Sequence, residues 1–406
     1  MLKVLELFGG IGACTKALDK LNIPHEIVDY VEIDKYAVKS FNAINNTNFE
    51  PQDICKWDKK IDVDLIMHGS PCQDFSIAGK QAGGDKNSGT RSSLMYETLR
   101  IVENLKPKYV IWENVKNLVS KKHIHNFASY IRAMENLGYK NYYKVLNSKY
   151  YGIPQNRERV FTISIREDIS SDFHFPEKRE LKTKLKDMLE SNVDEKYYLS
   201  SKAIEGRMLT NYKKYKLDDN CINGKDVHPT IMARYDGAPT LLKEKLCNKL
   251  IEENKVEEGD VIRHSYSTNR MNNFHKQSIN NELSPTLDTR CDCLGIAVKN
   301  NTKKGYLIAH PGDGVYTNIS NKRGTVQKEM IQTITTFQDK GVVEPDLRIR
   351  KLTPLECWRL MGFEDKDFHK AEKINSNAQL YKQAGNSIVV NVLEEILKIL
   401  LKEEMK

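Results

Sequence analysis

Near the amino terminus the sequence reads Leu5-Glu6-Leu7-Phe8-Gly9-Gly10-Ile11-Gly12-Ala13, an apolar strand that enters a glycine turn and then a helix. Glycines in such a turn let backbone amides approach a ligand closely, and the amino end of the helix attracts negative charge. Glu32 ends the next predicted strand, where a carboxylate can bind the hydroxyls of an adenosine ribose. Thr15 stands where a nicotinamide fingerprint has its third glycine. The pattern favours a nucleoside cofactor other than a nicotinamide dinucleotide, with a tight turn without ligand as the alternative.

Short β-rich runs alternate with helical patterns from residue 2 to about residue 165, which is typical of a mostly parallel sheet flanked by helices. The predicted strands are Val4–Phe8, Ile27–Val31, Leu65–His68, Tyr109–Trp112, Tyr143–Leu146 and Val160–Ile165. The predicted helices, with apolar residues three or four positions apart, are Ala13–Leu21, Asp34–Ile44 and Ser93–Leu105. The sequence therefore predicts an α/β, Rossmann-like core.

The texture changes after about Asp168, where the chain becomes rich in Lys, Asn, Asp and Thr with weak periodicity. We expect a first domain at 1–178, a smaller lobe rich in loops and strands at 179–348, and a return to the first domain at 349–406.

Two smaller patterns lie in these later parts. His228–Arg234 and Ser284–Arg290 share a Pro-Thr-aliphatic-x-x-Arg pattern, which is either a repeated strand and turn or a chance similarity among Thr-rich loops. Ser387–Leu401 is predicted to be an amphipathic helix, capped by Asn386 or Ser387.

Charge and cysteine usage narrow the class of protein. The 63 Lys and Arg residues against 55 Asp and Glu give a net charge of +8, which favours an anionic partner but also fits a basic enzyme that binds no nucleic acid. No segment has the pattern of a signal peptide or the length of a membrane span. The eight scattered cysteines fit a reducing cytoplasm. Because Cys291 and Cys293 have no second pair or nearby His, we expect no metal.

A second motif, Gly69-Ser70-Pro71-Cys72-Gln73-Asp74-Phe75-Ser76, directly follows the predicted strand Leu65–His68. Open α/β sheets bind substrates at the carboxyl ends of their strands, and Pro71 stiffens the backbone there. Cys72 is therefore a candidate nucleophile, and its polar neighbours argue against a small buried apolar side chain. The following loop, residues 77–90, is either a mobile lid or a plain surface loop.

Two further motifs carry charge at strand ends. Glu113, in Trp112-Glu113-Asn114-Val115, would hold a donatable proton if it were desolvated beside Cys72, and would otherwise be a solvated cap. In Gln155–Val160, strand alternation places Arg157 and Arg159 on one face. Paired guanidinium groups suit a carbonyl or phosphate oxygen, and the alternative is an exposed basic strand edge.

These four motifs, in this order and spacing, resemble the DNA (cytosine-5) methyltransferase family, especially its bacterial and phage members. Arg350–Phe363 and Gln383–Val390 add two further matches, so the resemblance covers residues 2–167 and 349–395. It implies a Rossmann-like core that uses S-adenosylmethionine, formed by 1–178 and 349–406, with a target-recognition domain at 179–348.

The resemblance implies a role for each matched residue. Cys72 would add to carbon 6 of a flipped-out cytosine, Glu113 would donate a proton, Arg159 would stabilise the ring carbonyl, and Arg157 would assist positioning. The cofactor residues would be Phe8, Gly10, Gly12, Glu32, Ile33, Asp53, Pro71, Leu94, Asn386 and Ser387. Ile33 replaces a tryptophan of several relatives, which predicts weaker stacking on adenine. The candidate DNA contacts are Gln73, Ser76, Arg234, Arg290, Arg323, Thr333 and Thr335.

The expected partner is double-stranded DNA, and no association with a membrane is expected. We expect a monomer that works in the cytoplasm of a bacterium or a phage-infected cell. A cognate restriction endonuclease acting separately, phage self-protection and solitary marking all fit. Three rival functions remain: an RNA cytosine methyltransferase, opposed by the long middle lobe; an inactive nucleic-acid-binding module, opposed by the intact catalytic set; and a nicotinamide-dependent oxidoreductase, opposed by Thr15.

Overall fold

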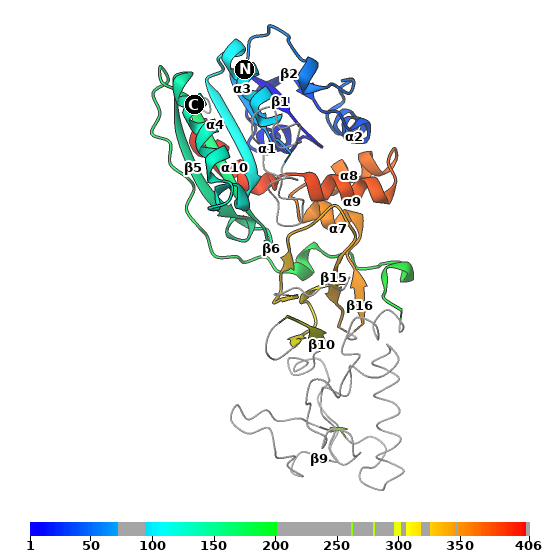
Figure 1. Ribbon diagram of the computed structural model, residues 1–406. Coiled ribbons are helices and arrows are strands. Elements are labelled where there is room, and N and C mark those ends of the chain that lie inside the picture. The colour runs from blue at the N-terminus through cyan, green and yellow to red at the C-terminus, as the bar shows by residue number, and fades with distance from the viewer. Residues whose placement is uncertain are drawn as a thin grey trace. The chain divides into compact units, whose positions relative to one another are not determined.

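The computed structural model describes residues 1–71, 94–200, 261–262, 279–280, 296–301, 306–317, 325–345 and 348–402 (Figure 1). The chain divides into two compact units. Unit 1 consists of Met1–Lys184, Thr333–Phe337 and Pro354–Lys406, and unit 2 of Leu185–Gln332 and Gln338–Thr353. The sequence predicted boundaries after residues 178 and 348, whereas these units divide after Lys184 and Thr353, and the short segment Thr333–Phe337 belongs to unit 1.

Unit 1 is built on a six-stranded sheet in the order β2-β1-β3-β4-β7-β5. Its strands are β1 Leu2–Leu7, β2 His25–Val31, β3 Leu65–His68, β4 Tyr109–Val115, β5 Tyr139–Asn147 and β7 Glu158–Arg166. Strands β1 to β4 are parallel to one another, whereas β7 is antiparallel to both β4 and β5. The predicted mostly parallel α/β sheet is confirmed, and each predicted strand has a counterpart.

Eight helices of unit 1 accompany this sheet in the described part of the chain. They are α1 Ala13–Lys20, α2 Lys35–Asn45, α3 Met95–Leu105, α4 Ile124–Asn136, α7 Pro354–Arg359, α8 Asp365–Glu372, α9 Asn377–Asn386 and α10 Val390–Leu400. Local chemistry sets their ends: α2 begins where Oδ1 of Asp34 accepts a bond from the Tyr36 amide, and it ends at Asn46 in the left-handed conformation.

The carboxyl-terminal helix differs from its prediction. We expected one helix from Ser387 to Leu401, but α9 ends at Asn386, and Ser387 is its C-cap with extended backbone angles of φ −70° and ψ 160°. The next helix, α10, starts at Val390 after Val389, with no side-chain cap. Asn386 and Ser387 therefore end one helix instead of capping the next, because the backbone turns at Ser387 in a way that apolar periodicity does not show.

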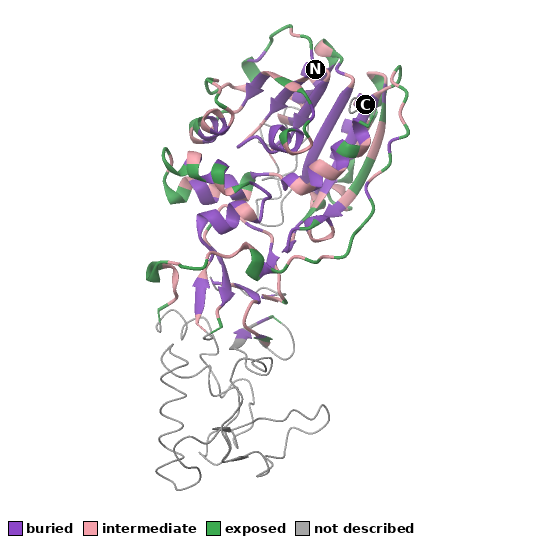
Figure 2. Cartoon of the chain, turned by 180° about the vertical axis from the view of Figure 1, so that it is seen from behind, coloured by how far each residue is buried: buried purple, intermediate pink, exposed green. Residues whose placement is uncertain are grey.

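The core of unit 1 lies on both faces of the central strands. Leu5, Leu7, Ile66, Val110 and Trp112 are at most 1% exposed. Figure 2 shows this distribution, with buried strands in the middle of the sheet and exposed residues on the outer sides of the helices. The sheet interior is therefore mainly apolar, as strands covered on both faces require, and the few buried polar side chains of the strands include His68, Glu113 and Asn114.

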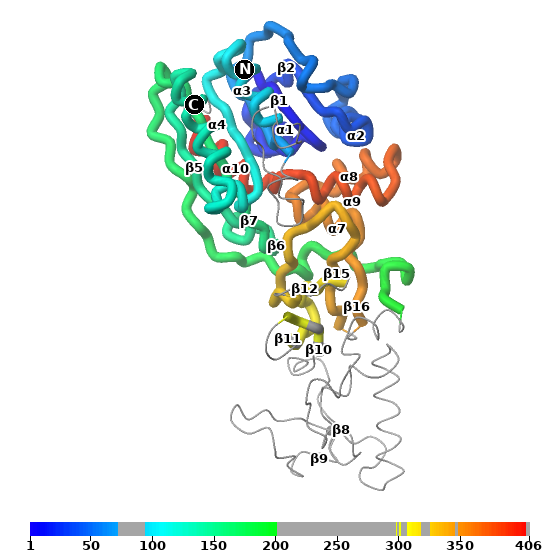
Figure 3. Tube along the Cα trace, in the orientation of Figure 1, coloured from blue at the N-terminus to red at the C-terminus, as the bar shows by residue number. Residues whose placement is uncertain are grey.

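The carboxyl-terminal segment packs on the amino-terminal helices, and Figure 3 shows the red end of the chain beside the blue start. Lys16 of α1 is nearly buried, with its Nζ 2.5 Å from Glu364 Oε2 and 2.7 Å from Asp367 Oδ2. Lys382 of α9 makes a further link, 2.6 Å from Asp34 before α2. Removing the Lys16 charge would leave the buried Asp367 carboxylate unpaired, which typically costs about 3–5 kcal/mol.

The described part of unit 2 consists mainly of short strands. Its strands in the described residues are β8 Val261–Ile262, β9 Ile279–Asn280, β10 Ile296–Lys299, β11 Tyr306–Ala309, β12 Gly314–Tyr316, β13 Val326–Gln327, β14 Ile331–Gln332, β15 Lys340–Val343 and β16 Ile349–Lys351. An antiparallel sheet has the order β13-β12-β15-β16, and β10 pairs with β11. A small core of Val298, Ala309, Val315, Val343 and Ile349 packs between them. Within the part of the chain that is described, none of the helices is both long and apolar enough to span a bilayer.

Candidate active site

The parallel strands of unit 1 bring several motif residues to one edge of the sheet. Leu7 at the end of β1 pairs with Val31 of β2 and with His68 of β3, and His68 pairs with Trp112 of β4. The Phe8 turn, Glu32, the Gly69–Pro71 segment and Glu113 therefore follow or end neighbouring strands. This carboxyl edge is where open α/β sheets bind ligands.

The glycine turn after β1 is shaped by two aromatic rings beneath it. Gly12 has a φ of 81°, and a β-carbon there would lie 2.7 Å from the ring of Phe41, so only glycine fits. Phe41 stacks on Tyr30 at 3.9 Å between ring centroids, and the Tyr30 hydroxyl donates to the carbonyl of Gly10. A β-carbon on Gly10 would meet nothing within 4 Å, so the backbone on that side is open to a ligand.

Glu32 lies against this turn. Its Oε2 accepts a hydrogen bond from the Gly10 amide at 3.1 Å, and its Oε1 accepts one from the Asp34 amide at 2.8 Å. Burial raises the pKa of Glu32, and the two amides oppose the rise because they stabilise the charged form. Each carboxylate oxygen can accept more than one bond, so this carboxylate has room for the hydroxyls of a ribose.

Two other predicted cofactor residues lie close to Glu32 in the chain. The amide of Gln52 donates to the carbonyl of Glu32 at 2.8 Å, which brings the neighbouring Asp53 to the end of β2. Oδ1 of Asp53 accepts from the Cys55 amide at 3.0 Å and begins a short 3₁₀ helix, Ile54–Lys56. Ile33 is 70% exposed. An open glycine turn, a partly buried carboxylate, a second carboxylate and an exposed apolar side chain together fit the ribose and adenine of an adenosine cofactor.

The remaining predicted cofactor residues have other surroundings. Phe8, with a φ of 54°, and Leu94, the N-cap of α3, are partly buried against the main core. Pro71 is partly buried at the end of a described stretch. Asn386 is the last residue of α9, and the backbone of Ser387 binds Arg157. The structure therefore groups Gly10, Glu32 and Asp53 more tightly than the rest.

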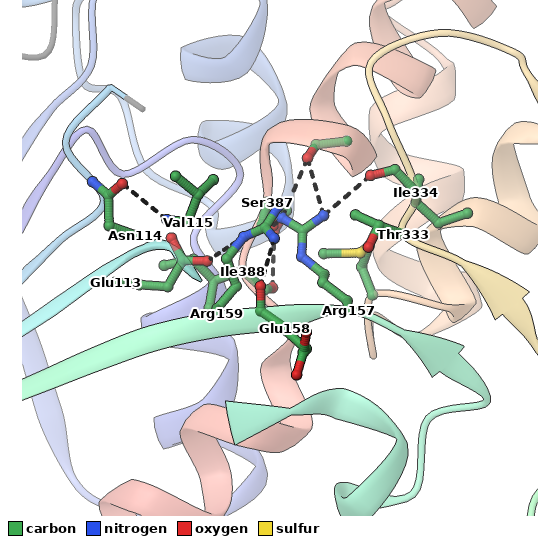
Figure 4. Close-up of polar contacts among 12 residues, drawn as sticks. Glu113, Asn114, Val115, Arg157, Glu158, Arg159, Thr333, Ile334, Ser387 and Ile388 are labelled. Atoms are coloured by element: carbon green, nitrogen blue, oxygen red, sulfur yellow. Dashed lines mark hydrogen bonds and ion pairs between the residues drawn. The ribbon is translucent and has the colours of Figure 1, made fainter. Parts of the chain in front are cut away.

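Glu113 and Arg159 form a pair across two antiparallel strands (Figure 4). Nε of Arg159 lies 3.1 Å from Oε1 of Glu113, and the two side chains are 18% and 11% exposed. This Oε1 atom is buried and is not aligned to accept a hydrogen bond. Burial raises the pKa of Glu113, while the charges of Arg159 and Arg157 hold it down. A carboxyl group in this setting can retain and donate a proton, with a cation beside it for developing negative charge.

Arg157 is placed differently from Arg159, although both lie near Glu113. Arg157 precedes β7 and is 4% exposed. Its guanidinium group donates to the carbonyl oxygen of Ile334 at 3.1 Å and to that of Ser387 at 2.8 Å (Figure 4). It thereby joins the Thr333–Phe337 segment to the end of α9, which suits a positioning role.

Several predicted site residues lie outside the described residues: Cys72, Gln73, Ser76, Arg234, Arg290 and Arg323. Of the two candidate threonines that are described, Thr333 donates through Oγ1 to the Asn156 carbonyl at 2.8 Å, and Thr335 donates to the Phe337 carbonyl at 3.3 Å. Across the described stretches, no three His, Cys, Asp or Glu side chains gather closely enough to hold a metal ion.

Sequence reasoning missed two polar side chains at this edge. Asn114 and Ser70 are both buried and are joined by a hydrogen bond from Asn114 Nδ2 to the Ser70 carbonyl at 3.1 Å. The alternation of side chains along β4 could have indicated that Asn114 points away from the Glu113 side. Its partner could not be inferred, because 44 positions separate the two residues.

Comparisons with known proteins identify the family of the chain. The family model of C-5 cytosine-specific DNA methylases matches residues 2–402. The "Orphan methyltransferase M.SPRI" of Bacillus phage SPR is 35% identical over 440 residues, covering 98% of this chain and 97% of that protein. The "Type II methyltransferase M2.ScrFI" of Lactococcus lactis subsp. cremoris is 32% identical and covers 100% of both chains.

Two solved structures share the fold. A mutant of Spodoptera frugiperda DNMT2 aligns with a TM-score of 0.56 at 19% identity, covering 99% of this chain and 100% of that one. The Dnmt2 methyltransferase of S. pombe aligns with a TM-score of 0.55 at 17% identity, over 99% of each chain. At these identities the likeness supports the α/β methyltransferase fold.

Proposed function

The chain belongs to the family of C-5 cytosine-specific DNA methylases, and we propose that it methylates carbon 5 of a cytosine flipped out of duplex DNA through a covalent adduct with Cys72. As a member of this family the chain is a DNA (cytosine-5) methyltransferase, as the sequence resemblance predicted. The buried Glu113–Arg159 pair is the observation that best supports the proposed mechanism, because it places a carboxyl group, whose pKa burial raises, beside a fixed cation.

S-adenosylmethionine is the proposed cofactor and would supply an electrophilic methyl group. The Glu32 carboxylate would accept the ribose hydroxyls, and the open backbone at Gly10 would let the cofactor approach the turn. Asp53 would bind the adenine amino group, and Ile33 would cover the ring with less stacking than an aromatic residue. Phe8, Gly12, Pro71, Leu94, Asn386 and Ser387 complete the proposed pocket.

Cys72 would supply the nucleophile that the chemistry requires. Carbon 5 of cytosine reacts poorly with an electrophile while the ring is aromatic. Addition of the Cys72 thiolate to carbon 6 forms a carbon–sulfur bond, moves an electron pair towards ring nitrogen 3, and leaves carbon 5 nucleophilic. After methylation, loss of the carbon 5 proton restores the ring and expels the thiolate.

Glu113 and Arg159 would stabilise the charge that this addition creates. The protonated Glu113 carboxyl donates to ring nitrogen 3, and Arg159 donates to the ring carbonyl oxygen. A positioned proton donor is typically worth about 10²–10⁴-fold in rate. Arg157 would keep its neighbours in place through the carbonyl groups of Ile334 and Ser387.

Duplex DNA is the proposed substrate of the enzyme. A paired cytosine is shielded in the helix, so it must leave the stack, at a cost of about a few kcal/mol. The net charge of +8 favours phosphate contacts, which help to offset that cost. We assign recognition of the target sequence to residues 179–348, with Arg234, Arg290, Arg323, Thr333 and Thr335 as contact candidates, and Gln73 and Ser76 beside the flipped base.

The names of two relatives suggest two biological roles for the enzyme. We propose a monomer, with any cognate restriction endonuclease acting as a separate protein. A relative named as a Type II methyltransferase favours a restriction partner, whereas a phage relative named as an orphan favours solitary action.

The experiment that tests this function is transfer of a labelled methyl group to duplex DNA, RNA and pre-methylated DNA. We expect label in unmethylated duplex DNA alone, located as 5-methylcytosine at one recurrent sequence. Labelling by the Cys72→Ser variant at the parent rate would refute the nucleophile, and label in RNA alone would favour the rival RNA methyltransferase.

A further inference from the structure

Ser70 is held by two side chains of the neighbouring strand β4. Nδ2 of Asn114 donates to the Ser70 carbonyl at 3.1 Å, and the indole Nε1 of Trp112 donates to Ser70 Oγ at 3.0 Å. Ser70 is 4% exposed, and Asn114 and Trp112 are each 1% exposed. Because water does not reach these groups, loss of either bond would leave a buried polar atom without its partner.

The two faces of β4 carry different groups. Side chains alternate along a strand, so Trp112 and Asn114 share one face while Glu113 lies on the other, towards Arg159. Oδ1 of Asn114 accepts from the Val115 amide at 2.8 Å. This bond fixes the amide orientation, because the oxygen must face the Val115 donor and the nitrogen is then directed at Ser70.

Trp112 is itself held rigidly. Its ring stacks on His68 with 5.6 Å between centroids and an interplanar angle of 8°, and it packs against Tyr130 at 4.1 Å. Nε2 of His68 lies 3.0 Å from the Tyr130 hydroxyl. Burial lowers the pKa of His68 to about 3, so the ring stays neutral at physiological pH. His68 ends β3, so this stack fixes the strand where the chain leaves it.

We propose that Trp112 and Asn114 are positioning residues for the nucleophile, acting through Ser70. This inference rests on the proposed function, since it requires Cys72 to attack the base. Only Pro71 separates Ser70 from Cys72 in the sequence. Strand β4 thus places the proton donor with one face and anchors the approach to the nucleophile with the other.

The consequence concerns one step of the reaction. Addition of Cys72 needs the sulfur at a defined distance from carbon 6 while Glu113 meets ring nitrogen 3. A displacement of the sulfur by about 1 Å can lower the rate of such a step by about 10²-fold. The cofactor residues Gly10, Glu32 and Asp53 lie on other strands and loops, so their contacts with a nucleoside do not involve the Ser70 bonds. Pro71 is the one residue of the proposed cofactor pocket that adjoins Ser70.

The test follows addition without methyl transfer. Duplex DNA carrying tritium at carbon 5 of the target cytosine is mixed with enzyme and S-adenosylhomocysteine. Addition of the thiolate at carbon 6 lets carbon 5 accept a proton from water. Loss of tritium from carbon 5 and expulsion of the thiolate then return cytosine, so tritium released into water reports Cys72 addition.

Two conservative variants remove the same hydrogen bond, between Trp112 and Ser70 Oγ, one from each side. Trp112→Phe keeps an aromatic ring but has no N–H donor, and Ser70→Ala removes the accepting Oγ. The control is Ser164→Ala, because Ser164 is equally buried and donates to Asn141 Oδ1 in the same sheet, away from the site. We expect tritium release to fall by about tenfold or more in both variants and to stay within about twofold in the control.

Binding measurements separate positioning from general loosening. The Kd values for S-adenosylhomocysteine and for DNA should stay within about twofold of the parent in Trp112→Phe and Ser70→Ala, and the double variant should be no slower than the slower single variant. Unchanged release, or release that falls in step with weaker cofactor binding, would overturn the proposal.

A third variant tests the other bond. Asn114→Asp keeps the oxygen that accepts from Val115 but cannot donate to Ser70, so release should fall while the Kd for S-adenosylhomocysteine holds. Because a buried aspartate can unfold the chain, the Tm of Asn114→Asp is measured beside that of the parent. If this variant does not fold, the results for Trp112→Phe and Ser70→Ala decide the proposal. Tritium release by Cys72→Ser at the parent rate would refute the nucleophile itself, whereas loss in Cys72→Ser with normal release in Ser70→Ala refutes only the positioning role.

Discussion

Two carboxyl groups at the same edge of the sheet, the partly buried Glu32 after β2 and the buried Glu113 in β4, have opposite surroundings. Backbone amides of Gly10 and Asp34 donate to the two oxygens of Glu32. Glu113 instead faces the Arg159 guanidinium and has a buried oxygen that accepts no hydrogen bond. Burial raises the pKa of both groups. The difference in neighbours, and not burial alone, is what supports the separate roles proposed for the two groups, Glu32 as an acceptor and Glu113 as a proton donor.

The largest expected effect comes from removing the proton donor. Glu113→Gln keeps the shape of the side chain but cannot give up a proton, so kcat for methyl transfer should fall by about 10²–10⁴-fold. Titration calorimetry should show an unchanged Kd for S-adenosylhomocysteine, since Glu32 is untouched. A kcat near that of the parent would remove the distinction between the two carboxyl groups.

The second effect concerns the cation beside Glu113. Arg159→Met removes a donor to the ring carbonyl, so kcat should fall by about 10²–10³-fold. The same change should shift the pH profile. Arg159 holds the pKa of Glu113 down, and the protonated form is the active one, so the alkaline limb of kcat should move to higher pH in the variant. A limb that moves to lower pH would contradict the assignment.

The third effect should appear in binding and not in chemistry. Glu32→Gln replaces a carboxylate acceptor by an amide, so the Kd for S-adenosylhomocysteine should rise by about 10- to 100-fold, as expected for loss of a charge-assisted bond. At saturating cofactor, kcat should stay within a few-fold of the parent. A lowered kcat with unchanged Kd would exchange the roles of Glu32 and Glu113.

The smallest effect concerns a third buried carboxyl group, Glu6 of β1, which accepts from the Thr15 amide at 2.8 Å. Burial raises the pKa of Glu6 to about 7. Since the folded chain then holds this proton more tightly than the unfolded chain, stability falls as pH rises from about 4.5 to 7. Glu6→Gln should therefore raise the Tm more at pH 8 than at pH 5, by about a few degrees. An equal change at both pH values would show that Glu6 is already ionised at low pH.

The sequence was sufficient to predict the strands of the unit 1 sheet and to identify the polar residues that follow them. Leu65–His68 was predicted with the observed bounds, because a short apolar run before a polar loop is readable from local pattern. The resemblance in six motifs is confirmed across residues 2–402. The placement of Glu32 against the Gly10 turn also agrees with what the strand order would give.

Contacts between distant parts of the chain could not be read in the same way. Arg157 was predicted from strand alternation, but its partners Ile334 and Ser387 lie 177 and 230 positions away. The Ser70 bonds depend on how β3 and β4 align. The break at Ser387 is a backbone angle within an apolar pattern. The role of Cys72 stays a prediction, because the residue lies outside the described part of the chain.

The most direct measurement is the product formed with duplex DNA that carries 5-fluorocytosine at the target position, together with S-adenosylmethionine. Fluorine cannot leave carbon 5 as a proton does, so the account predicts an enzyme–DNA adduct that survives denaturant and maps by mass spectrometry to Cys72. A chain that methylates ordinary DNA yet forms no such adduct, or forms it through another residue, would contradict covalent catalysis by Cys72.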